Sequence, residues 1–168
     1  MSEQNQTIEL LMHRVRSIQK RFSVENNRGE SVLNVSPKLL AATKTVIISD
    51  TADNRIAQIK QCISPIVPKY HVIIDDGENF YVQRKFSLEH NYMIKGMPWE
   101  LYGNFSGFKY RAHDNTNNAV IFEIEKEMNK WDDRYQLTVY ERKFVNHAVC
   151  VAVSVDLAIA AMQRTHQN

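Results

Sequence analysis

The chain has 168 residues, 43% hydrophobic and 24% charged, which is typical of one globular domain and argues against a largely disordered chain. Its 21 basic and 19 acidic side chains leave a net charge of +2, which argues against a dedicated nucleic-acid binder. Two cysteines, Cys62 and Cys150, cannot build a disulfide framework, and the polar start of the chain lacks the apolar run of a signal peptide. We therefore expect one cytoplasmic domain over residues 1–168, with residues 1–6 disordered.

Apolar and polar residues alternate along most of the chain, a pattern that predicts strands with one buried face. Counting these runs between turn signals gives about twelve short strands, which favours a barrel or a sandwich. The inward positions, in chain order, are Ile8, Leu10 and Met12; Val46 and Ile48; Tyr70, Val72 and Ile74; Trp99, Leu101 and Phe105; Val120, Phe122 and Ile124; and Tyr135, Leu137 and Val139.

Polar clusters rich in Asp, Asn and Gly separate the runs at residues 25–29, 50–54, 75–79 and 114–118. Such residues tolerate positive φ and cap their own turns, so the clusters are predicted to be hairpin tips. The first three turns start at positions 26, 50 and 75, and this regular spacing indicates a repeated strand–turn–strand unit. The longer gap before the fourth cluster holds a predicted extra hairpin at residues 91–105.

The C-terminal stretch FVNHAVCVAVSVDLAIAAM (residues 144–162) is apolar on every side of any helix drawn through it. Such a helix must be surrounded by protein or by lipid. Valines at alternate positions from 149 to 155 also allow a strand, and the length would suit a membrane span. A carboxylate such as Asp156 costs about 3 kcal/mol near the centre of a bilayer, which argues against the span. The residues alone leave all three structures open and favour a helix in a protein core.

Six segments, in a fixed order, carry a family likeness: QKRFSV (19–24), SPKLL (36–40), IKQCISPIVPKY (59–70), RKFSL (84–88), WELYGNF (99–105) and VSVD (153–156). Together they span about Thr7 to Met162, and the ordered series resembles the LURP-one-related family. The resemblance implies a mainly β fold, in which about twelve antiparallel strands form a closed barrel around a central hydrophobic C-terminal helix at residues 143–163. Tubby C-terminal domains and phospholipid scramblases share that fold.

Inside such a barrel the carboxylate of Asp156 would lie in the core, where it must be hydrogen-bonded or neutralised. We interpret Asp156 as a structural anchor to a backbone amide, a tyrosine or a basic side chain. An enzymatic role would require Asp156 to face a cleft with a perturbed pKa.

Other polar groups resemble catalytic or metal sites only in part. Asp114 opens a partial EF-hand spacing that ends at Glu125, but Ala119 stands where a calcium loop needs glycine, so a hairpin turn is predicted. The pairs Asp75–Asp76 and Asp132–Asp133 are interpreted as solvated turn carboxylates, because adjacent side chains point apart.

His113 precedes an aspartate, as in some metal phosphohydrolases, but the remaining histidines show no ligand spacing. We therefore interpret His113 as structural or exposed. Nucleophile-elbow, phosphate-loop and dinucleotide motifs are also missing from the sequence. The sequence predicts a non-enzymatic protein with no catalytic residues, no metal and no cofactor, and it assigns no ligand-binding residue.

Basic residues recur beside the predicted strand ends. They could gather into a site for a phosphate or an anionic headgroup, or they could serve only to discourage pairing between strand edges. They are Lys20, Arg21, Lys38, Lys60, Lys69, Arg84, Lys85, Lys109 and Arg111.

The leading hypothesis is a binding or scaffolding module for an anionic lipid headgroup, a membrane surface or a phosphorylated small ligand. A protein-interaction module is the alternative, with Ile47, Ile73, Ile121 and Tyr140 predicted on the solvent side of the strands. An uncharacterised enzyme and a lipid scramblase are weaker alternatives. No nucleic-acid partner and no transmembrane segment are expected.

Overall fold

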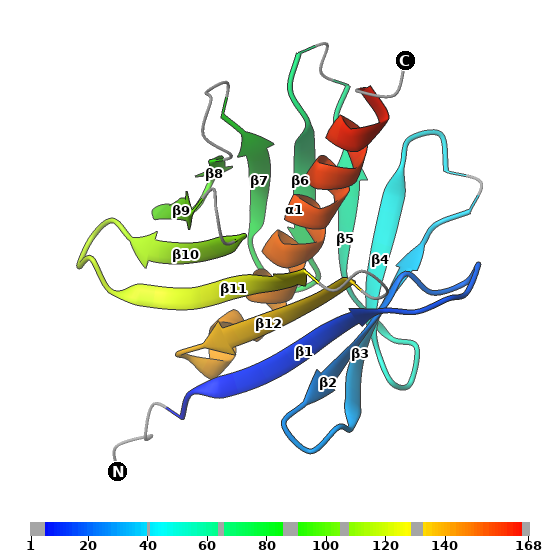
Figure 1. Cartoon of the computed structure of the whole chain (residues 1–168), viewed down its shortest axis with the longest axis horizontal. Helices are drawn as coiled ribbons and strands as arrows, with labels where there is room; N and C mark the ends of the chain where they lie inside the picture. Colours follow the sequence, from blue (N-terminus) through cyan, green and yellow to red (C-terminus); the bar gives the residue numbers. More distant parts are fainter. Residues whose placement is uncertain are drawn as a thin grey trace.

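The computed structural model describes residues 6–39, 41–63, 66–85, 91–104, 108–128 and 133–165, and these ranges form a β-barrel around one helix (Figure 1). Most of the segment expected to be disordered, residues 1–5, lies outside them, as do Phe105 and Asp132. The elements are β1 (Ile8–Arg14), β2 (Phe22–Asn26), β3 (Ser31–Pro37), β4 (Thr45–Asp50), β5 (Arg55–Gln61), β6 (Lys69–Ile74), β7 (Asn79–Arg84), β8 (Tyr92–Lys95), β9 (Trp99–Asn104), β10 (Lys109–Asp114), β11 (Val120–Met128), β12 (Asp133–Val139), the 3₁₀ turn η1 (Arg142–Phe144) and α1 (Val145–Thr165).

The barrel is closed and antiparallel, because every strand pairs with the next one in sequence and β1 pairs with β12. The closing pair sets Leu10 opposite Leu137 and Met12 opposite Tyr135. The architecture predicted from the family resemblance is therefore confirmed. Connections in such a barrel alternate between its two ends. We call the end with the β2–β3, β4–β5, β6–β7 and β10–β11 turns the turn end, and the other end the loop end.

Short turns at the turn end are held by their own side chains. The Asn26 side-chain oxygen accepts hydrogen bonds from the amides of Arg28 and Glu30 at 2.9 and 3.0 Å. Asp50 accepts from the amides of Ala52 and Asn54 in the same way, both at 2.9 Å. Asp114 accepts from the amide and the hydroxyl of Thr116, so the partial EF-hand spacing is a self-capped hairpin turn. Positive φ angles at Gly29, Asp53, Asp76 and Asn118 complete these turns.

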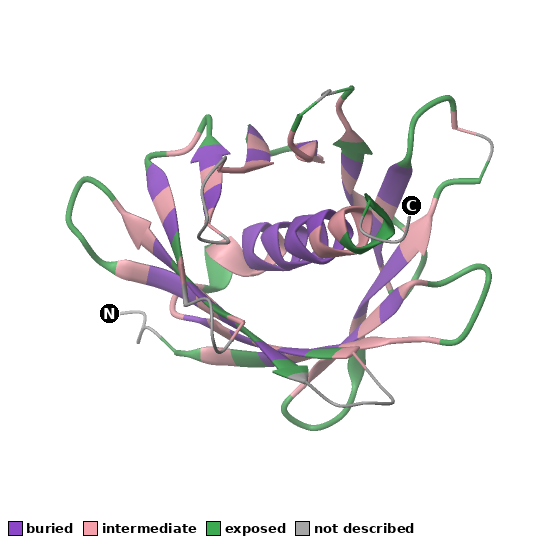
Figure 2. Ribbon diagram, turned by 45° about the horizontal axis from the view of Figure 1, so that its top comes forward, coloured by how far each residue is buried: buried purple, intermediate pink, exposed green. Residues whose placement is uncertain are grey.

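Helix α1 fills the lumen of the barrel. Its residues from His147 to Ala158 are buried without interruption, so the strands cover every face of this part of the helix (Figure 2). A hydrogen bond of 2.9 Å joins His147 Nε2 to Glu78 of the β6–β7 turn, which places the start of α1 at the turn end. Alanines at 148, 152 and 158 and Ser154 keep the helix narrow enough for this packing, and the buried Ser154 hydroxyl donates to the Cys150 carbonyl at 2.8 Å.

The environment of α1 decides between the alternatives left open by its sequence. The segment Arg142–Thr165 is long and apolar enough to cross a membrane, with a mean hydropathy of 1.8. However, 67% of that apolar window is buried inside the barrel, so protein surrounds it. The valines that would allow a strand instead lie in the helix. A membrane span would require exposing the faces that now pack against the strands.

The lumen has different aromatic residues at its two ends. Near the turn end the Trp99 ring lies edge-on to Phe122, Phe144 and His147, with ring centroids 5.1–5.9 Å apart. Near the loop end the large buried rings are mainly tyrosines, each within the first three residues of a strand that starts there. These are Tyr70, Tyr92, Tyr110 and Tyr135.

The prediction that Ile121 faces solvent is wrong. Its side chain is only 4% exposed, and it joins the hydrophobic core. The cause is a β-bulge: Ala112 pairs with Phe122 and His113 with Val120, which leaves Ile121 as an extra residue. A bulge breaks the strict alternation of faces, so two consecutive residues, Ile121 and Phe122, are both buried. The other three positions predicted on the solvent side are half-buried.

Candidate functional site

A buried carboxylate near the loop end organises the candidate site. Asp156 of α1 is 2% exposed and accepts hydrogen bonds from three side chains. The Tyr135 hydroxyl donates to its Oδ1 at 2.8 Å, and Arg14 Nη2 donates to the same atom at 3.3 Å. Arg21 Nη2 donates to its Oδ2 at 2.5 Å. The tyrosine and the basic partners expected from the sequence are thus both present, and the carboxylate is enclosed by them.

The strand register brings the two arginines together. Arg14 ends β1 and pairs with Phe22, the first residue of β2, while Arg21 directly precedes that strand. Both guanidinium groups lie over the Phe22 ring, at 5.0 and 5.6 Å from its centroid. Arg14 also donates to Asp133 Oδ2 from Nε at 3.1 Å and from Nη2 at 2.9 Å. The guanidinium of Arg14 therefore bridges two carboxylates and has a defined orientation.

A cavity of about 210 Å³ opens beside these arginines. Four of its lining residues are cationic, namely Arg14, Lys20, Arg21 and Lys44, and none of the described residues that line it carries a carboxylate. Lys20 comes from the β1–β2 loop, and Lys44 directly precedes β4. We call this cavity the basic pocket.

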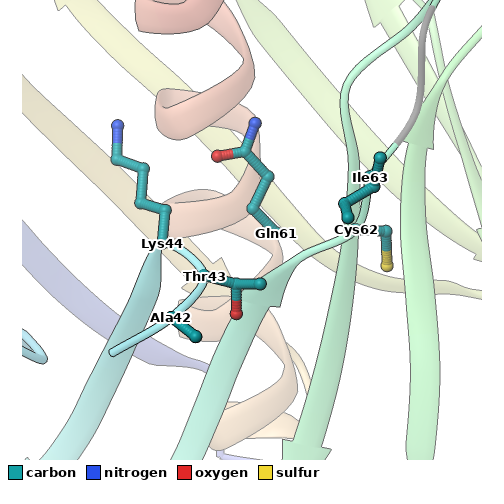
Figure 3. Close-up of a pocket in the computed structure, with 6 residues that line it drawn as sticks. All are labelled: Ala42, Thr43, Lys44, Gln61, Cys62 and Ile63. Carbon is teal, nitrogen blue, oxygen red and sulfur yellow. The ribbon is translucent and has the colours of Figure 1, made fainter. Parts of the chain in front are cut away.

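A second cavity, of about 320 Å³, adjoins the basic pocket and shares Lys44 with it. It lies between the β3–β4 and β5–β6 loops and is lined by Ala42, Thr43, Lys44, Gln61, Cys62 and Ile63. Figure 3 shows the ammonium of Lys44 and the amide of Gln61 extending in the same direction. A ligand in this second cavity would therefore meet hydrogen-bond donors from Lys44 and Gln61.

Positive charge is in excess around Lys44. Burial lowers the pKa of Lys44 below its ordinary value of 10.5, and the charges of Arg164 and Arg21 lower it further. Asp156 acts in the opposite direction, but as the smallest of these effects. The protein surroundings therefore stabilise the charged form of Lys44 less than water does. An anion bound in the basic pocket would stabilise the ammonium group.

Most of the basic residues noted in the sequence do not converge on the basic pocket. Lys85, Lys109 and Arg111 are paired with Glu100, Glu125 and Glu123, respectively. The Lys69 ammonium lies 4.5 Å from the centroid of the Tyr81 ring. Only Lys20 and Arg21 of that set line the pocket.

Sequence reasoning missed two of the four cationic lining residues, Arg14 and Lys44. Both stand where a strand meets a loop at the loop end, as Lys20 and Arg21 do. This shared position was the available signal. In an antiparallel barrel alternate connections lie at the same end, so basic residues that flank the β1–β2 and β3–β4 loops are expected to lie near one another.

The other polar residues considered in the sequence form no chemical centre. Asp75 is paired with Arg55 at 2.8 Å, and the His113 ring lies edge-on to Tyr102. The interpretation of Asp133 as a solvated turn carboxylate is wrong, because Asp133 forms an ion pair with Arg14. Within the described residues, no group of three His, Cys, Asp or Glu side chains could hold a metal ion.

Comparison with known proteins agrees with the fold. The family model for LURP-one-related proteins matches residues 8–157. An X-ray structure of an Arabidopsis thaliana protein superposes with a TM-score of 0.61 and covers 89% of this chain and 91% of its own, at 12% identity. That likeness concerns the fold alone, and no curated protein sequence matches. The family match extends over all twelve described strands and most of α1, so the chain belongs to the LURP-one-related family.

Proposed function

We propose that this protein is a non-enzymatic binding module of the cytoplasm, and that its basic pocket holds the phosphate of an anionic lipid headgroup. One observation carries the proposal: Arg14, Lys20, Arg21 and Lys44 surround a cavity among whose described lining residues there is no carboxylate. Free thiols at Cys62 and Cys150 support a reducing compartment.

The arginines of the pocket are arranged in advance for an anion. Arg21 is held by Asp156 through Nη2, and its buried Nε has no hydrogen-bond partner among the described atoms. A guanidinium fork donates to phosphate oxygens with little further loss of freedom, whereas lysine acts as a mobile point charge. The two side-chain types together would orient a phosphate and neutralise it.

Binding accounts for the buried carboxylate better than catalysis does. Asp156 is enclosed by three donors and lines neither cavity, so a substrate in the pocket would meet the arginines and not the acid. We assign Asp156 the role of fixing the two guanidinium groups. The kinship with tubby C-terminal domains and phospholipid scramblases that the family resemblance implies also supports a lipid headgroup. Scrambling itself would need α1 to leave its packed position.

Vesicle flotation tests the proposal. The protein should float with phosphatidylcholine vesicles that contain phosphatidylserine and remain unbound with pure phosphatidylcholine. Replacing Lys20 and Lys44 by Ala should weaken flotation about fivefold for each lysine, because a basic residue near an anionic surface contributes about 1 kcal/mol. Lys143→Ala is the matched control, since this exposed lysine pairs with Glu141 near the turn end and should leave flotation unchanged. Equal flotation with both kinds of vesicle would contradict the lipid ligand.

A second measurement separates the lipid from a free phosphate ester. Titration with sn-glycerol 3-phosphate, followed by NMR of the lysine ammonium groups, should shift Lys44 and leave Lys143 unshifted. The pKa of Lys44 should rise on binding, because the phosphate supplies the missing negative charge. Binding of glycerol 3-phosphate without flotation would assign the pocket to a free phosphate ester.

A further inference from the structure

Large aliphatic side chains are exposed on the loops beside the basic pocket. In the described part of the chain, five large hydrophobic side chains are more than half exposed, and four of them lie on the β1–β2, β3–β4 and β5–β6 loops. These four, which we call the aliphatic tips, are Ile18 (83% exposed), Leu39 (61%), Ile63 (96%) and Ile66 (75%). The fifth is Tyr102 of β9, whose hydroxyl donates to Glu100.

The three loops are neighbours around the loop end. The basic pocket lies between the β1–β2 loop and the β3–β4 loop, and the second cavity between the β3–β4 loop and the β5–β6 loop. Ile63 itself lines the second cavity. Figure 1 shows these loops on the side of the molecule where α1 ends. Aliphatic and cationic groups therefore share one end of the barrel.

Exposing the aliphatic tips to water is unfavourable in free energy, and this cost is removed when the side chains enter an apolar phase. The turns at the opposite end carry Asn, Asp and Thr at their tips, so exposed apolar residues are not a general property of this barrel's connections. Cations directly beside the aliphatic tips require a partner that is both anionic and apolar. A membrane with anionic headgroups over an acyl layer has both properties in that order of depth.

We propose that the loop end docks onto an anionic membrane, with Ile18, Leu39, Ile63 and Ile66 inserted at the boundary between headgroups and acyl chains. This inference rests on the proposed function, because the basic pocket would contact the phosphates of the same membrane. Helix α1 stays inside the barrel, and its C-terminal end with Arg164 points toward the bilayer. Docking is thus peripheral and orients the protein on the surface.

The test separates insertion from phosphate binding. In the double variant Leu39→Ser and Ile66→Ser, flotation with phosphatidylcholine–phosphatidylserine vesicles should fall about tenfold for each side chain, given the transfer free energy of an aliphatic side chain. Binding of sn-glycerol 3-phosphate should stay unchanged, since neither residue lines either cavity. Tyr102→Ser is the control, because it removes an exposed hydrophobic side chain that lies outside the three loops, and its flotation should match that of the parent.

Fluorescence gives an independent measure of depth. A tryptophan placed at Ile63 should be quenched by brominated phosphatidylcholine in anionic vesicles, in excess of any quenching of the parent protein. Unchanged flotation of the double serine variant, or no added quenching at position 63, would overturn docking while leaving the pocket proposal intact. Loss of self-association in the serine variant with normal flotation would instead make the aliphatic tips a protein interface. A parent protein that binds neither vesicles nor glycerol 3-phosphate would refute the proposed function itself.

Discussion

The two ends of the barrel are built from the same twelve strands but are held together by different kinds of polar contact. At the turn end, Asn26, Asp50 and Asp114 cap amides within four residues of themselves, and Trp99 packs in an apolar cluster beneath. At the loop end, the polar contacts join residues more than a hundred positions apart: Arg14 and Arg21 both reach Asp156.

This difference separates stability from binding. A self-capped turn has little hydrogen-bonding capacity left for a ligand, because its donors and acceptors already bind each other. At the loop end, Lys20 and Lys44 form no ion pair with a described carboxylate, and aliphatic side chains are exposed to water. Both features lower the stability of the isolated protein, and both are relieved by an anionic surface.

Removing the buried acid should have the largest effect. Asp156→Ala should lower the free energy of unfolding by about 3–5 kcal/mol, because the partners of a broken buried ion pair keep their charge without compensation. Urea denaturation measures the loss. Asp75→Ala is the control: it breaks a single ion pair with Arg55, whose side chain is 50% exposed, so the cost should be about 1 kcal/mol or less. Equal costs for the two variants would show that Asp156 is not the organising group of the loop end.

Alkaline pH should act mainly on the loop end. Burial raises the pKa of Tyr70 from 10.0 to about 12, and it raises the pKa values of Tyr92, Tyr110 and Tyr135 as well. A group whose pKa is higher in the folded state contributes stability that is complete below its unfolded value of 10.0 and is lost as the pH rises through the folded value. The free energy of unfolding should therefore fall steadily above pH 10. A flat profile up to pH 12 would mean that these hydroxyls ionise freely in the folded state.

Loss of one cap should weaken the turn end modestly and leave binding intact. Asn26→Ala removes three side-chain hydrogen bonds from the exposed β2–β3 turn and should cost about 1 kcal/mol of stability. Flotation with anionic vesicles should equal that of the parent protein. A change in flotation would couple the turn end to the membrane surface and break the proposed division between the ends.

Replacing a pocket lysine should reverse this pattern. In Lys44→Met, stability at neutral pH should be equal to or slightly greater than that of the parent, because the lowered pKa of Lys44 shows that its charge is disfavoured on folding. The gain should vanish as the pH rises above 10.5, because the amine then becomes neutral in the unfolded state as well as in the folded state. Flotation should weaken about fivefold. A marked loss of stability at neutral pH would indicate a structural role for the ammonium group.

Much of the fold was predictable from particular residues. Apart from the half-buried Val120, the described members of the inward series from Leu10 to Val139 lie on the buried faces of the strands, because alternation survives wherever pairing is regular. It failed at Ile121, where a bulge that depends on the register of the partner strand reverses the parity. The core helix could not be separated from a strand by local propensity, since valine at alternate positions suits both, and the family resemblance was needed to decide.

The candidate site was less accessible to prediction. The need of Asp156 for a tyrosine or a basic partner followed from burying a carboxylate, but its actual partners lie 21 to 142 residues away. Lys20 and Arg21 were noted with seven other basic residues, and nothing local distinguished them. Arg14 lies at the start of the same β1–β2 loop, but Lys44 comes from the β3–β4 loop, so convergence depends on the order of the strands around the barrel.

By itself the sequence determined the strand periodicity, the turns that cap themselves, and an apolar segment that must be covered, because each of these depends on contacts within a few residues or on simple burial. Only the tertiary structure decided what covers that segment, which four cations meet, and that the exposed isoleucines and Leu39 lie beside them. Closing the sheet brings β1 against β12 and sets alternate loops at one end, and this geometry exists only when all the strands are paired.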